Sequence, residues 1–168
     1  MSLNIDVLAE YLQDHLGGAA GAIDLLRRRL DDGRGDGELR ELLGGIESHR
    51  ESLEALMRDL EIDRSKLHQV VGWLAERMSQ IKLQGEALRD GALRDLLELE
   101  TLSIGVHGKQ RLWRSLSAIR DGHPALQALD LDALLETGER QLEIVERHRR
   151  AAVARAFLEG SAAAPDPA

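Results

Sequence analysis

Apolar residues recur every three or four positions along several long stretches of this sequence. The pattern is clearest over residues 38–60, where one line of side chains keeps that spacing throughout. Its members are Leu39, Leu42, Ile46, His49, Leu53, Leu56 and Leu60. Residues three and four apart lie on the same face of an α-helix. The spacing therefore predicts a long amphipathic helix with one face turned toward a core.

The same spacing predicts long helices over residues 5–30, 92–119 and 131–158, and a shorter one over residues 65–83. Asn4 is the expected N-cap of the first helix. Turns rich in Gly, Asp and Pro separate these segments. Residues 1–158 are expected to form a single domain, and residues 159–168 a disordered C-terminal tail with nothing to pack.

Composition agrees with an all-α fold. Hydrophobic residues make up 43% of the chain but aromatic residues only 2%, so Leu and Ala must fill the core. The chain contains no Cys, which excludes disulfides and thiolate ligands. A net charge of −8 argues against a nucleic-acid surface. No apolar run reaches the length of a membrane span, and the N-terminus does not resemble a secretory signal, so a cytoplasmic location is expected.

The order of the expected helices indicates how they are connected. The segment at residues 65–83 lies between a leading and a trailing helix pair, and at about 1.5 Å per residue it is long enough to run along most of a bundle. A long crossover between two antiparallel pairs is the ferritin-like connection. The predicted fold is therefore a ferritin-like antiparallel four-helix bundle with an additional helix in the crossover.

Three strings carry a resemblance to known proteins: residues 11–17 (YLQDHLG), residues 73–76 (WLAE), and residues 99–109 (LETLSIGVHGK) followed by Leu112 and Trp113. On these residues the chain resembles the ferritin-like superfamily, and more closely a group of bacterial helical-bundle proteins within it whose activity is not assigned. The resemblance covers nearly the whole chain apart from the tail. It implies the fold, and it implies no activity.

The chain departs from the ligand pattern of ferritin-like di-iron sites. Such sites take one Glu from each of two helices and a Glu-x-x-His pair from each of the other two. Here Glu47 is followed three residues later by Arg50, Glu143 by Glu146, and Glu146 by Arg149. Iron storage or oxygen activation of the standard kind is therefore not expected.

Six His and Glu residues nevertheless fall in phase with the apolar lines, near the middle of their helices. They are His15, His49, Glu100, His107, Glu139 and Glu146. The midpoints of antiparallel helices lie at the same height, so these groups could form one layer. Three interpretations stay open: a hydrogen-bonded polar layer that fixes helix register, an altered metal site for iron or manganese (zinc fits the same ligands), or helix phases that leave several of these residues in solvent.

Other charged residues are assigned by their positions. His68, His123 and His148 fall outside the apolar lines and are expected to be exposed. Arg111 is in phase with Glu100, which makes it a candidate buried counter-ion. A group of arginines near the end of the last helix suits the negative end of the helix dipole, with phosphate binding as the alternative. These are Arg147, Arg149, Arg150 and Arg155.

The long helix expected over residues 92–119 carries apolar residues on two sides. The inner side is expected to hold Leu93, Leu97 and Ile104. The opposite side holds Leu99, Leu102, Val106 and Trp113. A helix that is apolar on two faces is buried on two faces. The second face is therefore covered by the crossover helix, or else it forms a homodimer interface.

No sequence pattern supports a particular catalytic activity. The pairs Gly17–Gly18 and Gly44–Gly45 do not follow strands, so they are not phosphate-binding loops. Whether the chain is an enzyme is left open. The first hypothesis is a non-enzymatic structural or interaction protein with a buried His/Glu layer. The second is a metal-binding protein, an oxidoreductase among the options, that uses the six residues above.

Overall fold

The computed structural model describes residues 3–62 and 91–158, and every regular element in these ranges is a helix. Four long helices occur close to their predicted bounds, so the all-α prediction is confirmed. The predicted segment at residues 65–83 and the predicted tail lie outside the described residues. The elements are α1 (Ile5–Asp31), α2 (Gly37–Asp59), α4 (Gly91–Ala118), the 3-10 helix η3 (Arg120–Gly122), α5 (Pro124–Ala128) and α6 (Leu131–Phe157).

Three of the long helices begin at a capping side chain. The Oδ1 atom of Asn4 accepts a hydrogen bond from the amide of Val7 at 3.3 Å, as the sequence predicted. Asp36 caps α2 and Asp130 caps α6 in the same way, at 3.1 and 3.0 Å. Each cap satisfies an amide that the first helical turn would otherwise leave unpaired.

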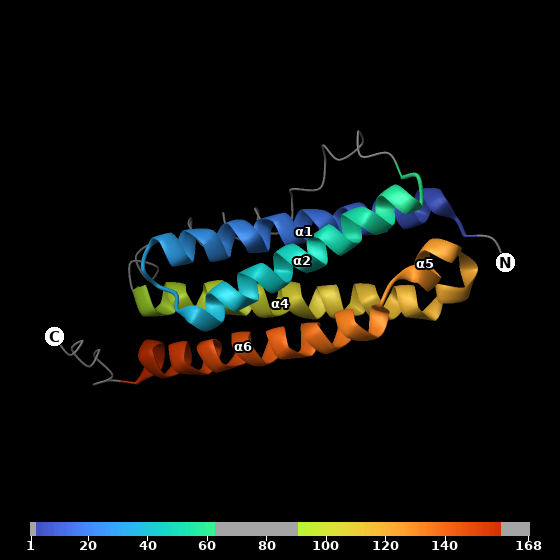
Figure 1. Ribbon diagram of the computed structural model, residues 1–168. Coiled ribbons are helices and arrows are strands. Elements are labelled where there is room, and N and C mark those ends of the chain that lie inside the picture. The colour runs from blue at the N-terminus through green and yellow to red at the C-terminus, as the bar shows by residue number, and fades with distance from the viewer. Residues whose placement is uncertain (1–2, 63–90, 159–168) are drawn as a thin grey trace.

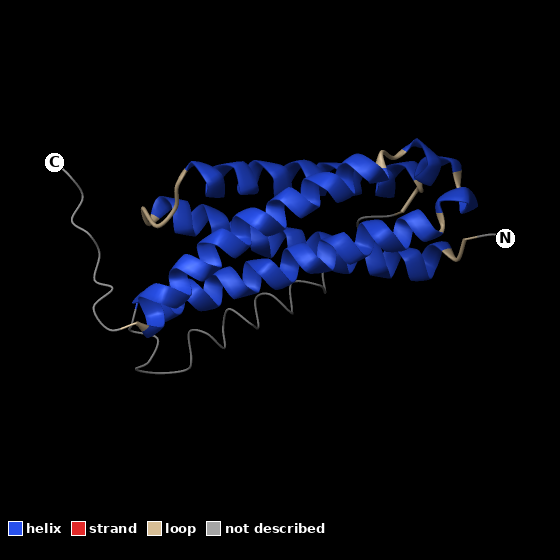
Figure 2. Cartoon of the chain, turned by 90° about the horizontal axis from the view of Figure 1, so that it is seen from below, coloured by secondary structure: helices blue, strands red, loops and turns tan. Residues whose placement is uncertain are grey.

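The long helices form two antiparallel hairpins, one of α1 and α2 and the other of α4 and α6 (Figure 1). The two hairpins pack so that α1 lies beside α4 and α2 beside α6. The end of α2 and the start of α4 lie at opposite ends of the bundle (Figure 1). In the described ranges the connecting loops gather at the two ends of the helices (Figure 2).

The turn between α4 and α6 contains a short helix that the sequence analysis did not predict. The ring nitrogen Nδ1 of His123 accepts a hydrogen bond from the amide of Ala125 at 3.2 Å, and Pro124 follows at the first helical position. Pro suits that position because its missing N–H would have no partner there. The fully buried Leu126 anchors the short helix to the bundle.

Two apolar clusters form the core, one toward each end of the bundle. The first includes Leu26, Leu42, Leu99 and Val145, and the second includes Leu12, Leu56, Leu116 and Leu126. The apolar line predicted for α2 is confirmed, because all seven of its members are buried.

The face of α4 that points into the core is the one that the sequence analysis placed outside. Leu99, Leu102 and Val106 are at most 2% exposed, whereas Ile104 is 45% exposed. The predicted inner line was therefore wrong. The helix carries Leu on nearly all sides, so its own sequence does not favour one face, and packing against the other helices makes the choice.

The four residues predicted to form a homodimer interface are buried in the core for the same reason, so this prediction is wrong. Leu99, Leu102 and Val106 belong to the first apolar cluster and Trp113 to the second, where the other long helices cover them. These four side chains stabilise the monomer and are not available to a partner.

The apolar line that the spacing predicts on α6, with Leu135, Leu142 and Val153, is also out of phase, by about one residue. The buried positions are Leu131, Leu134, Gly138, Gln141, Ile144, Val145 and Ala152. Glu139, which was expected to border the core, is exposed.

Candidate functional site: a polar layer between two apolar clusters

A layer of polar side chains separates the two apolar clusters near the middle of the bundle. It is built by three helices, and we call it the central polar layer. Its members are His49 from α2, Lys109, Gln110 and Trp113 from α4, and Thr137 and Gln141 from α6. Along each helix, the layer residues other than Trp113 lie between members of one cluster and members of the other, and Trp113 borders the layer as a member of the second cluster.

His49 is the centre of this layer and is only 4% exposed. The indole Nε1–H of Trp113 donates to Nδ1 of His49 at 3.2 Å. The other ring nitrogen, Nε2, lies 3.0 Å from the hydroxyl oxygen of Thr137. An indole nitrogen can only donate, so Nδ1 must be unprotonated. The imidazole is therefore neutral, with its proton on Nε2, from which it donates to Thr137.

Thr137 completes this chain of hydrogen bonds. Its hydroxyl donates to the backbone carbonyl of Ala133 in the preceding turn of α6. The oxygen is then free to accept from His49, which fits the tautomer deduced from Trp113. The rings of His49 and Trp113 meet edge to face with centroids 5.8 Å apart, a favourable geometry for aromatic pairs. The imidazole thus ties α2 to α4 and α6 at once.

The surroundings of His49 disfavour its charged form. Burial lowers the pKa of His49 to about 3, and the nearby ammonium of Lys109 contributes to the lowering. Both effects act in the same direction, because a buried cation loses its hydration and a second positive charge repels it. His49 is therefore neutral throughout the physiological pH range.

Lys109 is a second base in the same layer. Its Nζ donates to the side-chain carbonyl of Gln141, which is a neutral partner. Burial lowers the pKa of Lys109 to about 7. A lysine whose hydrogen-bond partner is an amide lacks the carboxylate that would hold its charge, so its ammonium loses its proton more readily than an exposed one.

Two glycines make room for the amides of this layer. A Cβ atom at Gly138 would lie 2.8 Å from the side-chain amide of Gln110, and one at Gly45 would lie 2.6 Å from Nε2 of Gln141. Gln110 in turn donates to the backbone carbonyl of Leu135 at 2.9 Å. Close approach of the helices at these two glycines therefore lets the glutamines span the gap between them.

The structure brings only one of the six predicted site residues into the layer, namely His49. His15 is partly buried and contacts the ring of Tyr11 edge to face, and burial lowers its pKa despite the opposing charge of Asp14. His107 is exposed and lies 2.8 Å from the carbonyl oxygen of Ser103 in its own helix. Glu100 is partly buried on α4.

The two remaining predicted residues pair with arginines. Glu139 is exposed and lies 3.9 Å from Arg114. Glu146 accepts from Arg149 at 2.7 Å and from Arg150 at 2.8 Å, and these hydrogen bonds lower its pKa. Within residues 3–62 and 91–158, no three His, Asp or Glu side chains are grouped in a way that could hold a metal ion.

Other assignments from the sequence also need correction. Arg111 is exposed and does not act as a buried counter-ion. His123 and His148 are partly buried, not exposed as predicted. The Nε2 atom of His148 lies 3.3 Å from Glu38 across the contact between α6 and α2. His68 lies outside the described residues.

The arginines near the end of α6 are paired with carboxylates. Arg147 donates to Glu38 at 2.8 Å, and Arg155 lies 3.8 Å from Asp95. Together with the pairs of Arg149 and Arg150 to Glu146, these contacts give each of the four arginines a carboxylate partner. The pairing does not favour the alternative of phosphate binding.

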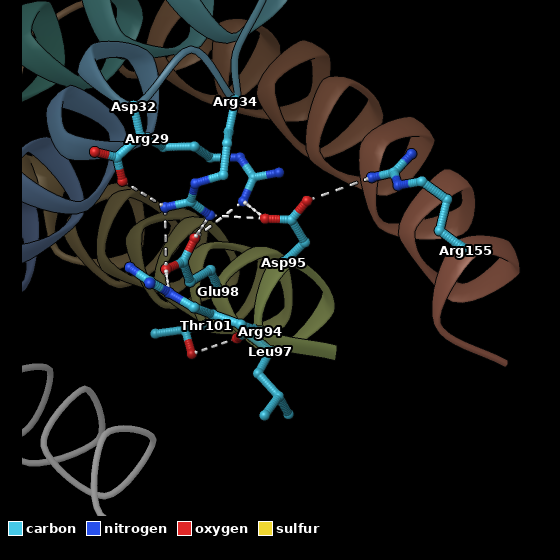
Figure 3. A network of polar contacts seen from close by, with 9 residues as sticks. All are labelled: Arg29, Asp32, Arg34, Arg94, Asp95, Leu97, Glu98, Thr101 and Arg155. Atoms are coloured by element: carbon cyan, nitrogen blue, oxygen red, sulfur yellow. Dashed lines mark hydrogen bonds and ion pairs between the residues drawn. The ribbon is translucent and has the colours of Figure 1, made fainter. Parts of the chain in front are cut away.

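A network of ion pairs, which the sequence analysis missed, joins the two hairpins near the turn after α1 (Figure 3). Arg29, at the end of α1, donates to Glu98 at 3.0 Å and to Asp95 at 3.1 Å. Arg34, in the turn after α1, donates to Glu98 at 2.6 Å and to Asp95 at 2.7 Å. Arg94 donates to the other oxygen of Glu98 at 3.0 Å. Three guanidinium groups thus surround one buried carboxylate.

Helix periodicity could have identified two members of this network. Arg29 follows the buried residues Leu25 and Leu26 at a spacing of four and three, and Glu98 precedes the buried Leu102 by four. Charged residues at core positions are rarely buried without a partner. The partners themselves come from other helices, so the sequence does not show which charges pair.

Comparisons of the chain with protein-family models, with curated proteins and with solved structures found no match. Among the helices that the structure describes, none is long and apolar enough to cross a membrane.

Proposed function

We propose that this chain is a ferritin-like helical bundle that serves as a non-enzymatic structural or interaction protein, and that the central polar layer fixes the register of its helices. The main support is that both ring nitrogens of the buried His49 are engaged, one with α4 and one with α6. Buried polar groups are costly unless they are paired, so a shift of any of these helices would leave the imidazole unsatisfied.

The ferritin-like assignment is supported by the course of the chain. Neighbouring long helices are antiparallel, and the end of α2 and the start of α4 lie at opposite ends of the bundle (Figure 1). A connection between those two ends must cover the length of the bundle. A bundle with one long crossover is ferritin-like, whereas an up-down-up-down bundle has only short loops.

The alternative, an altered site for iron or manganese, has less support. A histidine ligand needs a free ring nitrogen for the metal. Both nitrogens of His49 are already used, and His107 and Glu139 are exposed away from the layer. The polar layer contains amides, a hydroxyl and an amine in the places where carboxylates were expected.

The register proposal can be tested by replacing the layer with apolar side chains of similar size. The variant His49→Leu/Lys109→Met/Thr137→Val should keep its helical content by circular dichroism but give broad or doubled cross-peaks in a 1H–15N NMR spectrum. The matched control is Thr101→Val, because the buried hydroxyl of Thr101 bonds only within its own helix, to Leu97 at 2.8 Å. A single sharp set of peaks from the triple variant would overturn the proposal.

Elemental analysis tests the metal alternative independently. The protein is purified without a metal-affinity column, incubated aerobically with iron or manganese, and desalted. We expect no stoichiometric retention. Near-stoichiometric metal that is lost in a folded His49→Asn variant would replace the structural proposal with the metal-binding one.

A further inference from the structure

The titratable side chains in the central polar layer are bases. His49 and Lys109 lie in the same layer, and their hydrogen-bond partners there are an indole, a hydroxyl and an amide. None of these partners carries a negative charge that could neutralise an added proton. A proton added to this layer therefore has no carboxylate partner among the hydrogen bonds described.

The geometry of His49 also excludes a second proton on its ring. Nδ1 accepts from the indole of Trp113, which has no lone pair to offer in return. A proton on Nδ1 would place two N–H groups against each other. The imidazolium can form only after the indole of Trp113 has moved away, which breaks this contact between α2 and α4.

We propose that the central polar layer is an acid-sensitive lock between the two helical hairpins, which is closed while His49 is neutral and which opens when His49 takes up a proton on Nδ1. This inference rests on the proposed role of the layer in fixing helix register. It adds that acid pH releases the contact between the helices at this layer.

Within residues 3–62 and 91–158, several ionisable groups on the helices around the layer have partners of their own. On α6, Glu136 is exposed and bonded to Arg140, and Glu139 lies near Arg114. On α2 itself, Arg50 bonds to Glu54. On other described elements, Tyr11 bonds to Ser115, His15 contacts Tyr11, and His123 caps α5. Of all these, the charge that acts on His49 is that of Lys109.

The size of the effect follows from proton linkage. An exposed His49 in the open state has the ordinary pKa of 6.5, whereas in the closed state its pKa is about 3. Between pH 7.5 and pH 5.0 the closed state takes up almost no proton at this site, but the open state does. The ratio of open to closed molecules should therefore rise roughly 30-fold from His49 alone.

The experiment follows the indole N–H of Trp113 by hydrogen exchange in a Trp73→Phe background, which leaves one tryptophan. Opening constants, corrected for the intrinsic exchange rate, are compared at pH 7.5 and 5.0 with those of Trp73→Phe/His49→Asn. The Oδ1 atom of Asn can accept from Trp113 but does not titrate. His107→Asn, at an exposed histidine of α4, is the matched control. We expect opening to rise about 30-fold more in the parent than in His49→Asn, and the His107→Asn variant to follow the parent.

The outcomes separate the two proposals. If the parent and His49→Asn change by the same factor between the two pH values, the acid-sensitive lock is overturned. The register proposal fails separately, if the variant His49→Leu/Lys109→Met/Thr137→Val gives a single sharp set of cross-peaks at pH 7.5. Should His49→Asn not fold, the 15N shifts of the His49 ring in the parent decide. The lock would be overturned if, at pH 5.0, the molecules that have lost the contact with Trp113 still carry a neutral His49 ring.

Discussion

Arg29 and Glu98 form an ion pair inside the protein, with Nη1 of the arginine 3.0 Å from Oε2 of the glutamate and side chains only 3% and 1% exposed. The pair joins the end of α1 to the first third of α4, and so it connects the two hairpins. Arg34 and Arg94 bind the same carboxylate. Glu98 is the shared partner of three cations, and its loss would leave the buried guanidinium of Arg29 with Asp95 alone.

Replacing Glu98 should therefore be costly. Glu98→Ala is expected to lower the free energy of unfolding by ~3–5 kcal/mol, because removal of one partner leaves an uncompensated buried charge. The control is Glu136→Ala, which breaks the exposed pair with Arg140 and should cost less than ~1 kcal/mol. Urea unfolding followed by circular dichroism measures both. Equal costs for the two variants would contradict the structural role of the network.

Two adjacent glycines of α2 should respond differently to replacement by alanine. A Cβ at Gly44 meets nothing within 4 Å, so Gly44→Ala should stabilise the protein by ~0.5–1 kcal/mol, the usual gain in helix propensity. A Cβ at Gly45 would lie 2.6 Å from Nε2 of Gln141 and must displace that amide from Lys109. Gly45→Ala should gain less than Gly44→Ala or destabilise the protein. Thermal unfolding of the pair measures the difference, and equal gains would show that Gln141 is not held where the structure places it.

The buried and exposed sides of α4 can be compared by truncating one side chain on each. Leu102→Ala should cost ~2–5 kcal/mol, because Leu102 is 1% exposed and its loss leaves a cavity in the first apolar cluster. Ile104→Ala should cost less than ~1 kcal/mol, because Ile104 is 45% exposed. The reverse order in chemical unfolding would mean that the face first predicted from the sequence is the one in the core.

Lys109 makes stability depend on pH above neutrality. Its pKa is about 7 in the folded state and 10.5 when exposed, so between these values the unfolded chain binds the extra proton. The free energy of unfolding should therefore rise as the pH is raised from 7 toward 9.5, with a slope of at most ~1.4 kcal/mol per pH unit. Below pH 7 both states carry the proton and this contribution is flat. Urea unfolding at several pH values measures the slope, which Lys109→Met should remove. A slope that persists in this variant would show that another group is responsible.

Local sequence rules were sufficient for the helices themselves. Their existence and approximate bounds follow from three-and-four spacing, the cap at Asn4 and the glycine-rich turn after α1, all of which act within a few residues. The line predicted on α2 was correct because its apolar residues leave only one possible inner face. His49 is the one polar residue on that face. His49 is therefore the one predicted site residue that lies in the central polar layer.

The tertiary structure decided which residues His49 meets. On α4, Leu residues lie on both candidate faces, so the difference in burial free energy between the two orientations is small within the helix and is settled only by contacts with α1, α2 and α6. An error of one residue on a helix turns a side chain by about 100°. On α6 that rotation turns Glu139 away from the layer and brings in Gly138. On α4, His107 is exposed and Lys109 and Gln110 occupy the layer instead. The sequence by itself determined that this chain forms long helices with a polar residue in the middle of α2, because helix formation is governed by local contacts. Only the tertiary structure determined that the layer consists of a neutral imidazole, an amine and amides, and that Arg29 and Glu98 pair, because those choices depend on contacts between helices far apart in the chain.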